Sequence, residues 1–162
     1  HFRKMIAKDG EKILIHTSNF RKVKRIKDVL LTFNKVVQEM PAKLLMVGDG
    51  PERRPAEELC RELSVCDQVN FLGSQNAVEE IYSVADLFLL PSESESFGLA
   101  ALEAMACAVP VIASKAGGIP EVVIVGETGF TSNVGNVDKM AQDALFLLES
   151  EERWKQFSDA SL

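Results

Sequence analysis

The chain has 162 residues, of which 46% are hydrophobic and 26% charged, and its formal net charge is −6 at pH 7. This length fits one α/β domain with a substantial core, and the negative charge argues against nucleic acid as a partner. No apolar run approaches the ~20 residues that span a bilayer, and the basic start at Arg3 and Lys4 is not followed by the apolar stretch of a signal peptide.

Short apolar runs alternate with amphipathic stretches along the whole chain. Strands are predicted at residues 12–16, 43–47, 69–72, 87–90 and 111–113, with a short sixth strand at 129–131. Apolar residues at helical spacing predict helices over residues 26–37, from about Pro55, and over 78–83, 99–107 and 137–148. Asn136 is expected to cap the last of these helices, and residues 119–125 form a short helix or a turn.

The predicted strands are nearly continuous in apolar residues, as expected of parallel strands that helices cover on both faces. Their alternation with helices predicts an α/β fold, a Rossmann-like doubly wound parallel sheet, in a single domain spanning residues 1–162. In such sheets ligands bind at the carboxyl ends of the strands, near helix N-termini. The motifs described below all fall at these ends.

A basic cluster follows the first predicted strand. It consists of five residues in one short stretch: Arg21, Lys22, Lys24, Arg25 and Lys27. In an acidic protein this cluster indicates a local anion site. The alternative is a solvated basic helix start.

A polar loop and a helix follow the fourth predicted strand. The first amides of a helix that begins near Leu99 lack intrahelical acceptors and readily hold a phosphate, and Gly98 lets a ligand approach the backbone. Glu103 lies one turn into a helix of mostly apolar neighbours. A buried carboxylate there needs a partner, which the hydroxyls of a ribose would supply. The alternative is that Glu93 and Glu95 are simply solvated and Glu103 pairs with a lysine.

The three cysteines, Cys60, Cys66 and Cys107, match no metal-ligand spacing. No Asp-x-Asp sequence or His/Asp grouping is visible either. We therefore expect reduced thiols in a cytoplasmic protein that uses no metal ion.

Three further residues have structural explanations. His16 ends the first predicted strand, where a core or strand-end role is favoured over a catalytic one. Asp86 is expected to cap or orient the fourth strand. Ala108 lies directly before Val109-Pro110, where a turn is expected.

Glu95 and Glu103 are separated by seven residues within ESFGLAALEAMACAVPVIAS, which resembles the paired-glutamate motif of family-4 retaining glycosyltransferases of the GT-B fold. Further segments resemble motifs of the same family in the same order: VGDGPER at 47–53, VNFLG at 69–73, ADLFLLPS at 85–92, GGIPEVV at 117–123 and GETGF at 126–130. The resemblance covers residues 12–148. Two departures are Arg25, where the family has glycine if Lys24 is its lysine, and Ala108, where the family has glycine. The second puts only the geometry of the local turn in doubt.

The resemblance implies the C-terminal, donor-binding half of a metal-independent retaining glycosyltransferase that needs no cofactor beyond its nucleotide-sugar donor. The string SNFRKVKR further resembles the branch of the family that transfers N-acetylglucosamine from UDP-N-acetylglucosamine to L-malate in bacillithiol biosynthesis. Arg21 and Lys24 would neutralise the donor diphosphate, with Lys22 and Arg25 as the alternative pair. Stabilising the leaving diphosphate in this way would do the work that a metal ion does elsewhere.

The resemblance also implies the remaining donor contacts. Glu95 would meet hydroxyls of the donor sugar, and Glu103 would hold the ribose. Main-chain groups would supply the other contacts: Phe97 and Gly98 to the sugar, Gly98, Leu99 and Ala100 to the phosphates, and Phe71, Leu72 and Gly73 to the base. A hydrogen-bonding role for Glu95 is favoured over a nucleophilic one.

On this interpretation the N-terminal acceptor domain is absent, so we expect the chain to bind nucleotide without transferring sugar. The full-length enzyme could be a monomer or a homodimer. The alternatives are a non-catalytic nucleotide-binding domain and a related glycosyltransferase that acts on lipid or polysaccharide acceptors. A dinucleotide-dependent oxidoreductase is disfavoured because no G-x-G-x-x-G opens the first predicted helix.

Overall fold

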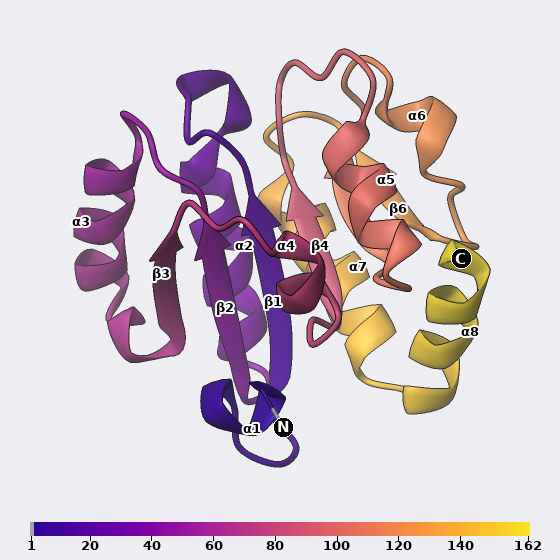
Figure 1. The fold of residues 1–162 in the computed structure, drawn as a ribbon, viewed down its shortest axis with the longest axis horizontal. Helices are drawn as coiled ribbons and strands as arrows, with labels where there is room; N and C mark the ends of the chain where they lie inside the picture. Colours follow the sequence, from indigo (N-terminus) through magenta and orange to yellow (C-terminus); the bar gives the residue numbers. More distant parts are fainter. Residues whose placement is uncertain (1) are drawn as a thin grey trace.

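The computed structural model describes residues 2–162, which form one six-stranded, all-parallel sheet (Figure 1). The strand order is β3-β2-β1-β4-β5-β6, so the chain winds outward in one direction from β1 and in the other from β4. This is the doubly wound Rossmann order, and the predicted fold class is confirmed. The strands are β1 Lys12–Thr17, β2 Ala42–Val47, β3 Val69–Gly73, β4 Leu87–Leu90, β5 Val111–Ser114 and β6 Gly129–Ser132.

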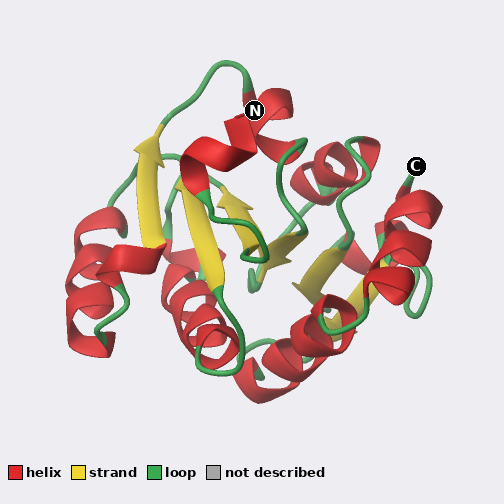
Figure 2. Cartoon of the chain, turned by 90° about the horizontal axis from the view of Figure 1, so that it is seen from below, coloured by secondary structure: helices red, strands yellow, loops and turns green. Residues whose placement is uncertain are grey.

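Helices cover both faces of the sheet, as Figure 2 shows in a view from below. One face carries α2 Ile26–Val37, α3 Arg53–Leu63 and α7 Val137–Leu148, with α8 Glu151–Ser161 following α7 at the edge. The other face carries α4 Val78–Tyr82, α5 Leu99–Ala106 and α6 Ile119–Val122, and α1 Phe2–Ile6 lies near the start of β1.

The two faces of the sheet bury separate cores. Phe33, Leu44 and Leu147 belong to the core under α2, α3 and α7. Phe88, Tyr82 and Ala104 belong to the core under α4 and α5. Strands that contribute to both cores are buried on both sides, which explains their continuous apolar sequence.

The predicted strands and long helices lie within one or two residues of those observed, and the segment predicted at 119–125 is helical over Ile119–Val122. Helix α3 begins at Arg53, two residues before Pro55, which lies in the first turn. The side chain of Asn136 accepts a hydrogen bond from the amide of Lys139 at 3.1 Å and caps α7 as predicted. The sequence analysis did not predict helix α8. It also missed α1 and the two 3-10 turns, η1 Lys22–Lys24 and η2 Cys66–Gln68, because elements as short as these three show no periodicity.

The structure confirms one structural prediction for a single residue and shows the conformation of another. Asp86 orients the strand edge, since its Oδ2 accepts hydrogen bonds from the amide of Ile13 at 2.8 Å and from Arg3 at 3.0 Å. Ala108 adopts a left-handed conformation at φ +63°, the region that glycine occupies without strain. The turn that was in doubt therefore forms without its glycine.

Among residues 2–162, no helix has both the length and the apolar character that crossing a membrane requires.

Candidate functional site

A pocket of about 380 Å³ opens at the carboxyl ends of β1 and β4, where the strand order reverses. These ends lie at the top of Figure 1. This is the place where doubly wound sheets bind ligands. The lining comes from the turn after β1, from the end of β4 and from the start of α5: Thr17, Ser18, Asn19, Lys24, Leu90, Glu95, Ser96, Phe97, Gly98, Leu99, Ala100 and Glu103.

An ion pair joins the two halves of the pocket. Nζ of Lys24 lies 2.6 Å from Oε2 of Glu95, and the same oxygen accepts a hydrogen bond from Oγ of Ser92 at 2.8 Å. The Glu95 side chain is only 8% exposed and that of Lys24 is 22% exposed. The loop between β4 and α5, residues 91–98 (the glutamate loop), is therefore not simply solvated at Glu95. Lys24 of the basic cluster contacts Glu95 in this loop.

The backbone holds the glutamate loop in place on both sides. The amide of Glu93 donates to the carbonyl oxygen of Val23 at 2.9 Å, which ties this loop to the turn after β1. The carbonyl oxygen of Glu95 accepts from the amide of Gly118 at 2.9 Å. A Cβ on Gly117, which has φ +50°, would overlap that same carbonyl group. The glycines of GGIPEVV thus leave room for the segment that presents Glu95.

The turn after β1 rests on a second pair of glycines. Cβ atoms on Gly48 and Gly50 would overlap the carbonyl oxygens of Ser18 and Asn19. Both glycines also have positive φ, at +129° and +157°, values that L side chains rarely adopt. The VGDGPER segment therefore shapes this pocket from behind by supporting Ser18 and Asn19.

The N-terminus of α5 faces the pocket. The first bond of the helix runs from the amide of Leu102 to the carbonyl oxygen of Gly98 at 3.0 Å, so the amides of Leu99 and Ala100 precede it and lack intrahelical acceptors. Gly98 has φ +65°, and a Cβ there would lie 3.2 Å from Val122. The tight turn and its packing therefore require this glycine, whether or not a ligand approaches.

Glu103 lies on the exposed face of α5, which corrects the expectation that it is buried. Leu102 and Ala106 are exposed on the same helix, while Ala101 and Ala104 are buried. No cation within residues 2–162 forms a salt bridge with Glu103, so the alternative of a lysine partner is not observed either. Its carboxylate lines the pocket and is free to accept hydrogen bonds from a ligand.

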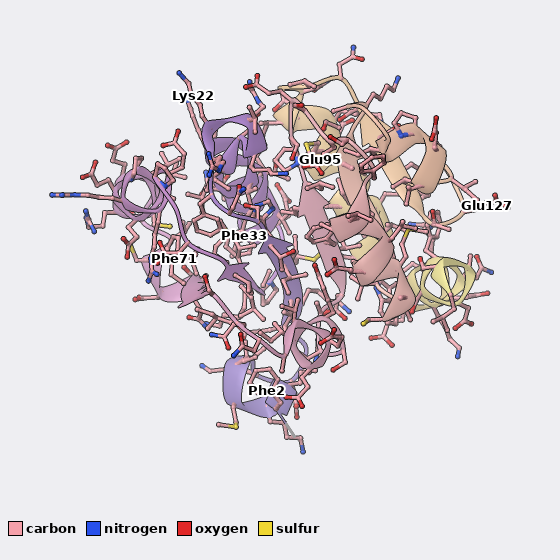
Figure 3. All side chains as sticks on the ribbon, turned by 45° about the horizontal axis from the view of Figure 1, so that its top comes forward. Phe2, Lys22, Phe33, Phe71, Glu95 and Glu127 are labelled. Carbon is pink, nitrogen blue, oxygen red and sulfur yellow. The ribbon has the colours of Figure 1, made fainter. Side chains whose placement is uncertain are left out.

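The other cations of the basic cluster do not line this pocket. Arg21 is exposed at the start of η1. Lys22 and Arg25 line a separate pocket of about 560 Å³ beside α2 and α3, where Arg25 pairs with Asp28 at 2.6 Å. Figure 3 shows Lys22 pointing away from Glu95. Of the four candidate cations, the structure brings only Lys24 into the pocket with the start of α5.

Leu72 and Gly73 end the edge strand β3, outside the lining of the pocket. The carbonyl oxygen of Gly73 accepts from the amide of Gly48 at 2.8 Å. The carbonyl oxygen of Leu72 accepts from the side chain of Gln75 at 2.6 Å. Both carbonyl groups are therefore already hydrogen-bonded.

His16 is fully buried directly behind the pocket. Its Nδ1 lies 2.8 Å from the carbonyl oxygen of Leu89, and its Nε2 lies 2.9 Å from Oγ of Ser18. Since a carbonyl oxygen only accepts, Nδ1 carries the hydrogen and Nε2 accepts from the Ser18 hydroxyl. Burial is the main reason that the pKa of His16 falls from 6.5 to about 4, so a neutral imidazole supports the turn at Ser18.

The sequence did not single out Thr17, Ser18 and Asn19 as pocket residues, nor Ser92 as a partner of Glu95. Small polar side chains after a strand carry no motif of their own. The only available signal was their position, directly after the carboxyl end of a central strand.

Side chains that could bind a metal ion do not cluster within residues 2–162. No group of three or more His, Cys, Asp or Glu residues within residues 2–162 is arranged to hold a metal ion. Cys60, Cys66 and Cys107 are free thiols, and burial raises the pKa of Cys60 to about 11.

The chain resembles known proteins in sequence. Residues 1–161 match the family model described as glycosyl transferases group 1. The chain is 54% identical over 144 residues to N-acetyl-alpha-D-glucosaminyl L-malate synthase of Bacillus anthracis, a match that covers 89% of this chain and 38% of that protein. It is 45% identical over 98 residues to D-inositol 3-phosphate glycosyltransferase of Rhodococcus erythropolis, covering 56% of this chain and 22% of that protein.

Solved structures share the fold. Sucrose-phosphate synthase from Thermosynechococcus elongatus superposes with a TM-score of 0.89 at 30% identity, covering 98% of this chain and 41% of that one. Alr3699/HepE of Anabaena gives a TM-score of 0.90 at 23% identity, covering 99% of this chain and 45% of that one. The chain thus spans less than half the length of these relatives.

The family match extends over nearly the whole chain, and the pocket that joins Lys24, Glu95 and the start of α5 lies where the sequence motifs converge. The chain therefore belongs to the glycosyl transferases group 1 family.

Proposed function

We propose that this chain is the donor-binding half of a retaining, metal-independent glycosyltransferase that transfers N-acetylglucosamine from UDP-N-acetylglucosamine to L-malate. The acceptor would be held by another domain. The sugar and the acceptor are proposed because of the 54% identity to the B. anthracis synthase, and UDP because Alr3699/HepE was solved in complex with UDP and glucose. The single observation that carries the proposal is one pocket lined by Lys24, Glu95, Glu103 and the start of α5.

The cationic side of the pocket suits the diphosphate. Lys24 supplies a compact charge, and the first amides of α5 add the partial positive charge of a helix N-terminus. Both would stabilise the negative charge that develops on the leaving diphosphate, and removal of one such group typically costs about 2.7–4 kcal/mol of barrier. Arg21 is the proposed second cation, because its side chain forms no ion pair within residues 2–162, whereas Arg25 is already paired with Asp28.

The carboxylates suit the hydroxyl groups of the donor. Glu95 faces the pocket beside Lys24, so it would accept from hydroxyls of the sugar attached to the diphosphate, together with the backbone of Phe97 and Gly98. Glu103 lies one turn further along α5 and would accept from the ribose. Leu72 and Gly73 would contact the base through main-chain atoms.

Calorimetric titration of the purified protein tests the proposal. UDP and UDP-N-acetylglucosamine are expected to bind more tightly than ADP or GDP. A chelator such as EDTA is expected to leave the affinities unchanged, because Lys24 and α5 supply the positive charge. Equal binding of all three nucleoside diphosphates would contradict the choice of UDP, and loss of binding in EDTA would contradict a metal-independent site.

A further inference from the structure

The charges of the pocket are unusual for a phosphate site. Its lining contains one cationic side chain, Lys24, and two carboxylates, Glu95 and Glu103. The one cation is already paired, at 2.6 Å, with Glu95. A diphosphate that enters this pocket must therefore share the Lys24 ammonium with a carboxylate that is already bound to it.

Glu95 is held more firmly than its partner. Its side chain is 8% exposed, Ser92 donates to the same Oε2, and its backbone carbonyl is bonded to Gly118. Ser92 is itself fully buried, and its carbonyl oxygen accepts from the hydroxyl of Ser114. Within residues 2–162 Oε1 of Glu95 accepts no hydrogen bond, and the Lys24 ammonium has no second acceptor. One carboxylate oxygen and two N–H groups thus remain available to a ligand.

A nucleoside diphosphate and a nucleotide sugar meet this pair differently. The terminal phosphate of UDP carries more negative charge than the same phosphate esterified to a sugar, so it loses more binding energy when Glu95 already neutralises Lys24. The sugar ester carries less charge, and its hydroxyls can donate to the free carboxylate oxygen. Glu95 therefore opposes the first ligand and favours the second.

We infer that the Lys24–Glu95 pair discriminates between donor and product: Glu95 competes with the diphosphate for Lys24 and so weakens the binding of UDP relative to the UDP-sugar. This inference rests on the proposed function. Besides its contact with the donor sugar, Glu95 would then favour release of the nucleoside diphosphate after transfer. A site with the cation alone would hold its more highly charged product too tightly.

The test is titration of wild-type protein and Glu95→Gln with UDP and with UDP-N-acetylglucosamine. Glutamine keeps the size of the side chain and an acceptor for Ser92 but removes the charge. UDP is expected to bind the variant about fivefold more tightly, the upper end for a partly exposed charge pair, while the UDP-sugar binds no more tightly than to the wild type. Glu95→Ala, which removes the whole side chain, is expected to change the affinity ratio in the same direction.

Two further variants show whether the effect passes through Lys24. Glu93→Gln is the matched control, since Glu93 lies in the same loop but faces Arg25 at 3.6 Å in the other pocket. It should leave the ratio of the two affinities unchanged. In a Lys24→Met background, Glu95→Gln should tighten UDP binding less than twofold.

The outcomes separate this inference from the proposed function. If wild-type protein binds neither UDP nor the UDP-sugar, the proposed function fails. If both bind and Lys24→Met weakens them, but Glu95→Gln leaves the ratio unchanged or shifts it toward the sugar donor, only the discrimination is overturned. An equal shift in the Glu93→Gln control would also overturn it.

Discussion

The two glutamates of the paired motif differ in environment although they lie only eight positions apart. Glu95 is almost fully buried in an ion pair, while Glu103 is exposed and has no ionic partner within residues 2–162. Their local sequences suggested the reverse, because Glu95 lies in a polar loop and Glu103 among apolar neighbours. Apolar neighbours on a helix do not decide burial, since the face that turns inward depends on what packs against it.

Replacement of Glu103 by alanine tests the proposed ribose contact. The change should weaken UDP binding by about 1.5 kcal/mol, the low end for hydrogen bonds to a charged group, because the carboxylate is well solvated without ligand. Calorimetry measures the effect, and Glu127→Ala is the control, since Glu127 is exposed at the far edge of the molecule (Figure 3). Unchanged affinity in Glu103→Ala would exclude the ribose assignment.

The buried His16 predicts a specific dependence of stability on pH. Its pKa is about 4 in the folded protein, mainly because of burial, and 6.5 without that environment. Between these values the unfolded chain binds more protons, so the stabilisation is complete above pH 6.5 and is lost as the pH falls toward 4. The loss amounts to about 3 kcal/mol at most.

Urea denaturation at several pH values between 4 and 7 checks this prediction. The free energy of unfolding of His16→Asn should depend less steeply on pH than that of the wild type, because asparagine does not titrate. The carboxylates common to both proteins cancel in the comparison of slopes. Identical slopes would mean that His16 is not held neutral by the fold.

At the scale of elements, pairs of glycines shape both sides of the pocket. Gly48 and Gly50, in the loop after β2, make room for the turn after β1. Gly117 and Gly118, in the loop after β5, make room for the glutamate loop after β4. Each supporting loop belongs to the strand next to the one that it supports, so the glycine motifs and the charged motifs form one unit only in the folded sheet.

The turn after α5 offers a stability prediction. Ala108 lies at φ +63°, where a non-glycine residue costs about 1–2 kcal/mol, partly offset by the greater backbone entropy that glycine loses. Ala108→Gly should therefore raise the free energy of unfolding by about 0.5–1 kcal/mol. Ala106→Gly, at the end of α5, is the control and should lower it by a similar amount, both measured by thermal unfolding. A loss of stability in Ala108→Gly would contradict the argument from strain.

One sheet separates two hydrophobic cores. Phe33 on α2 and Phe88 on β4 are both fully buried, but on opposite faces. Since the central strands contribute side chains to both cores, neither face can lose its packing without disturbing the sheet. We expect the domain to unfold as one cooperative unit.

Phe33→Ala tests this cooperativity. Truncation of a buried phenylalanine should cost about 3–5 kcal/mol. The urea transition should remain single and keep its slope, because the same surface is exposed on unfolding. Far-ultraviolet circular dichroism and tryptophan fluorescence provide independent probes, since Trp154 lies on α8 and donates to the carbonyl oxygen of Asp86 at 2.7 Å. Separate transitions by the two probes would show that the two faces unfold independently.

The amino-acid pattern alone predicts most of the elements and the fold class. Continuous apolar strands alternate with amphipathic helices. This pattern can be read from the local sequence, and it is typical of a parallel sheet that helices cover on both faces. The sequence also placed Lys24, Glu95 and the start of α5 at the carboxyl ends of strands, since topology alone decides at which edge these ends lie.

Which of these residues lie together could be seen only in the folded chain. The fold separates Lys24 from Lys22 and Arg25, which lie within two positions of it but line another pocket. Ser18 and Asn19 also line the pocket of Lys24. The side chain of Glu95 is buried there, whereas Glu103 is exposed. The physical reason is that direction, burial and pairing of a side chain depend on contacts between segments far apart in sequence: Lys24 meets a carboxylate 71 residues away.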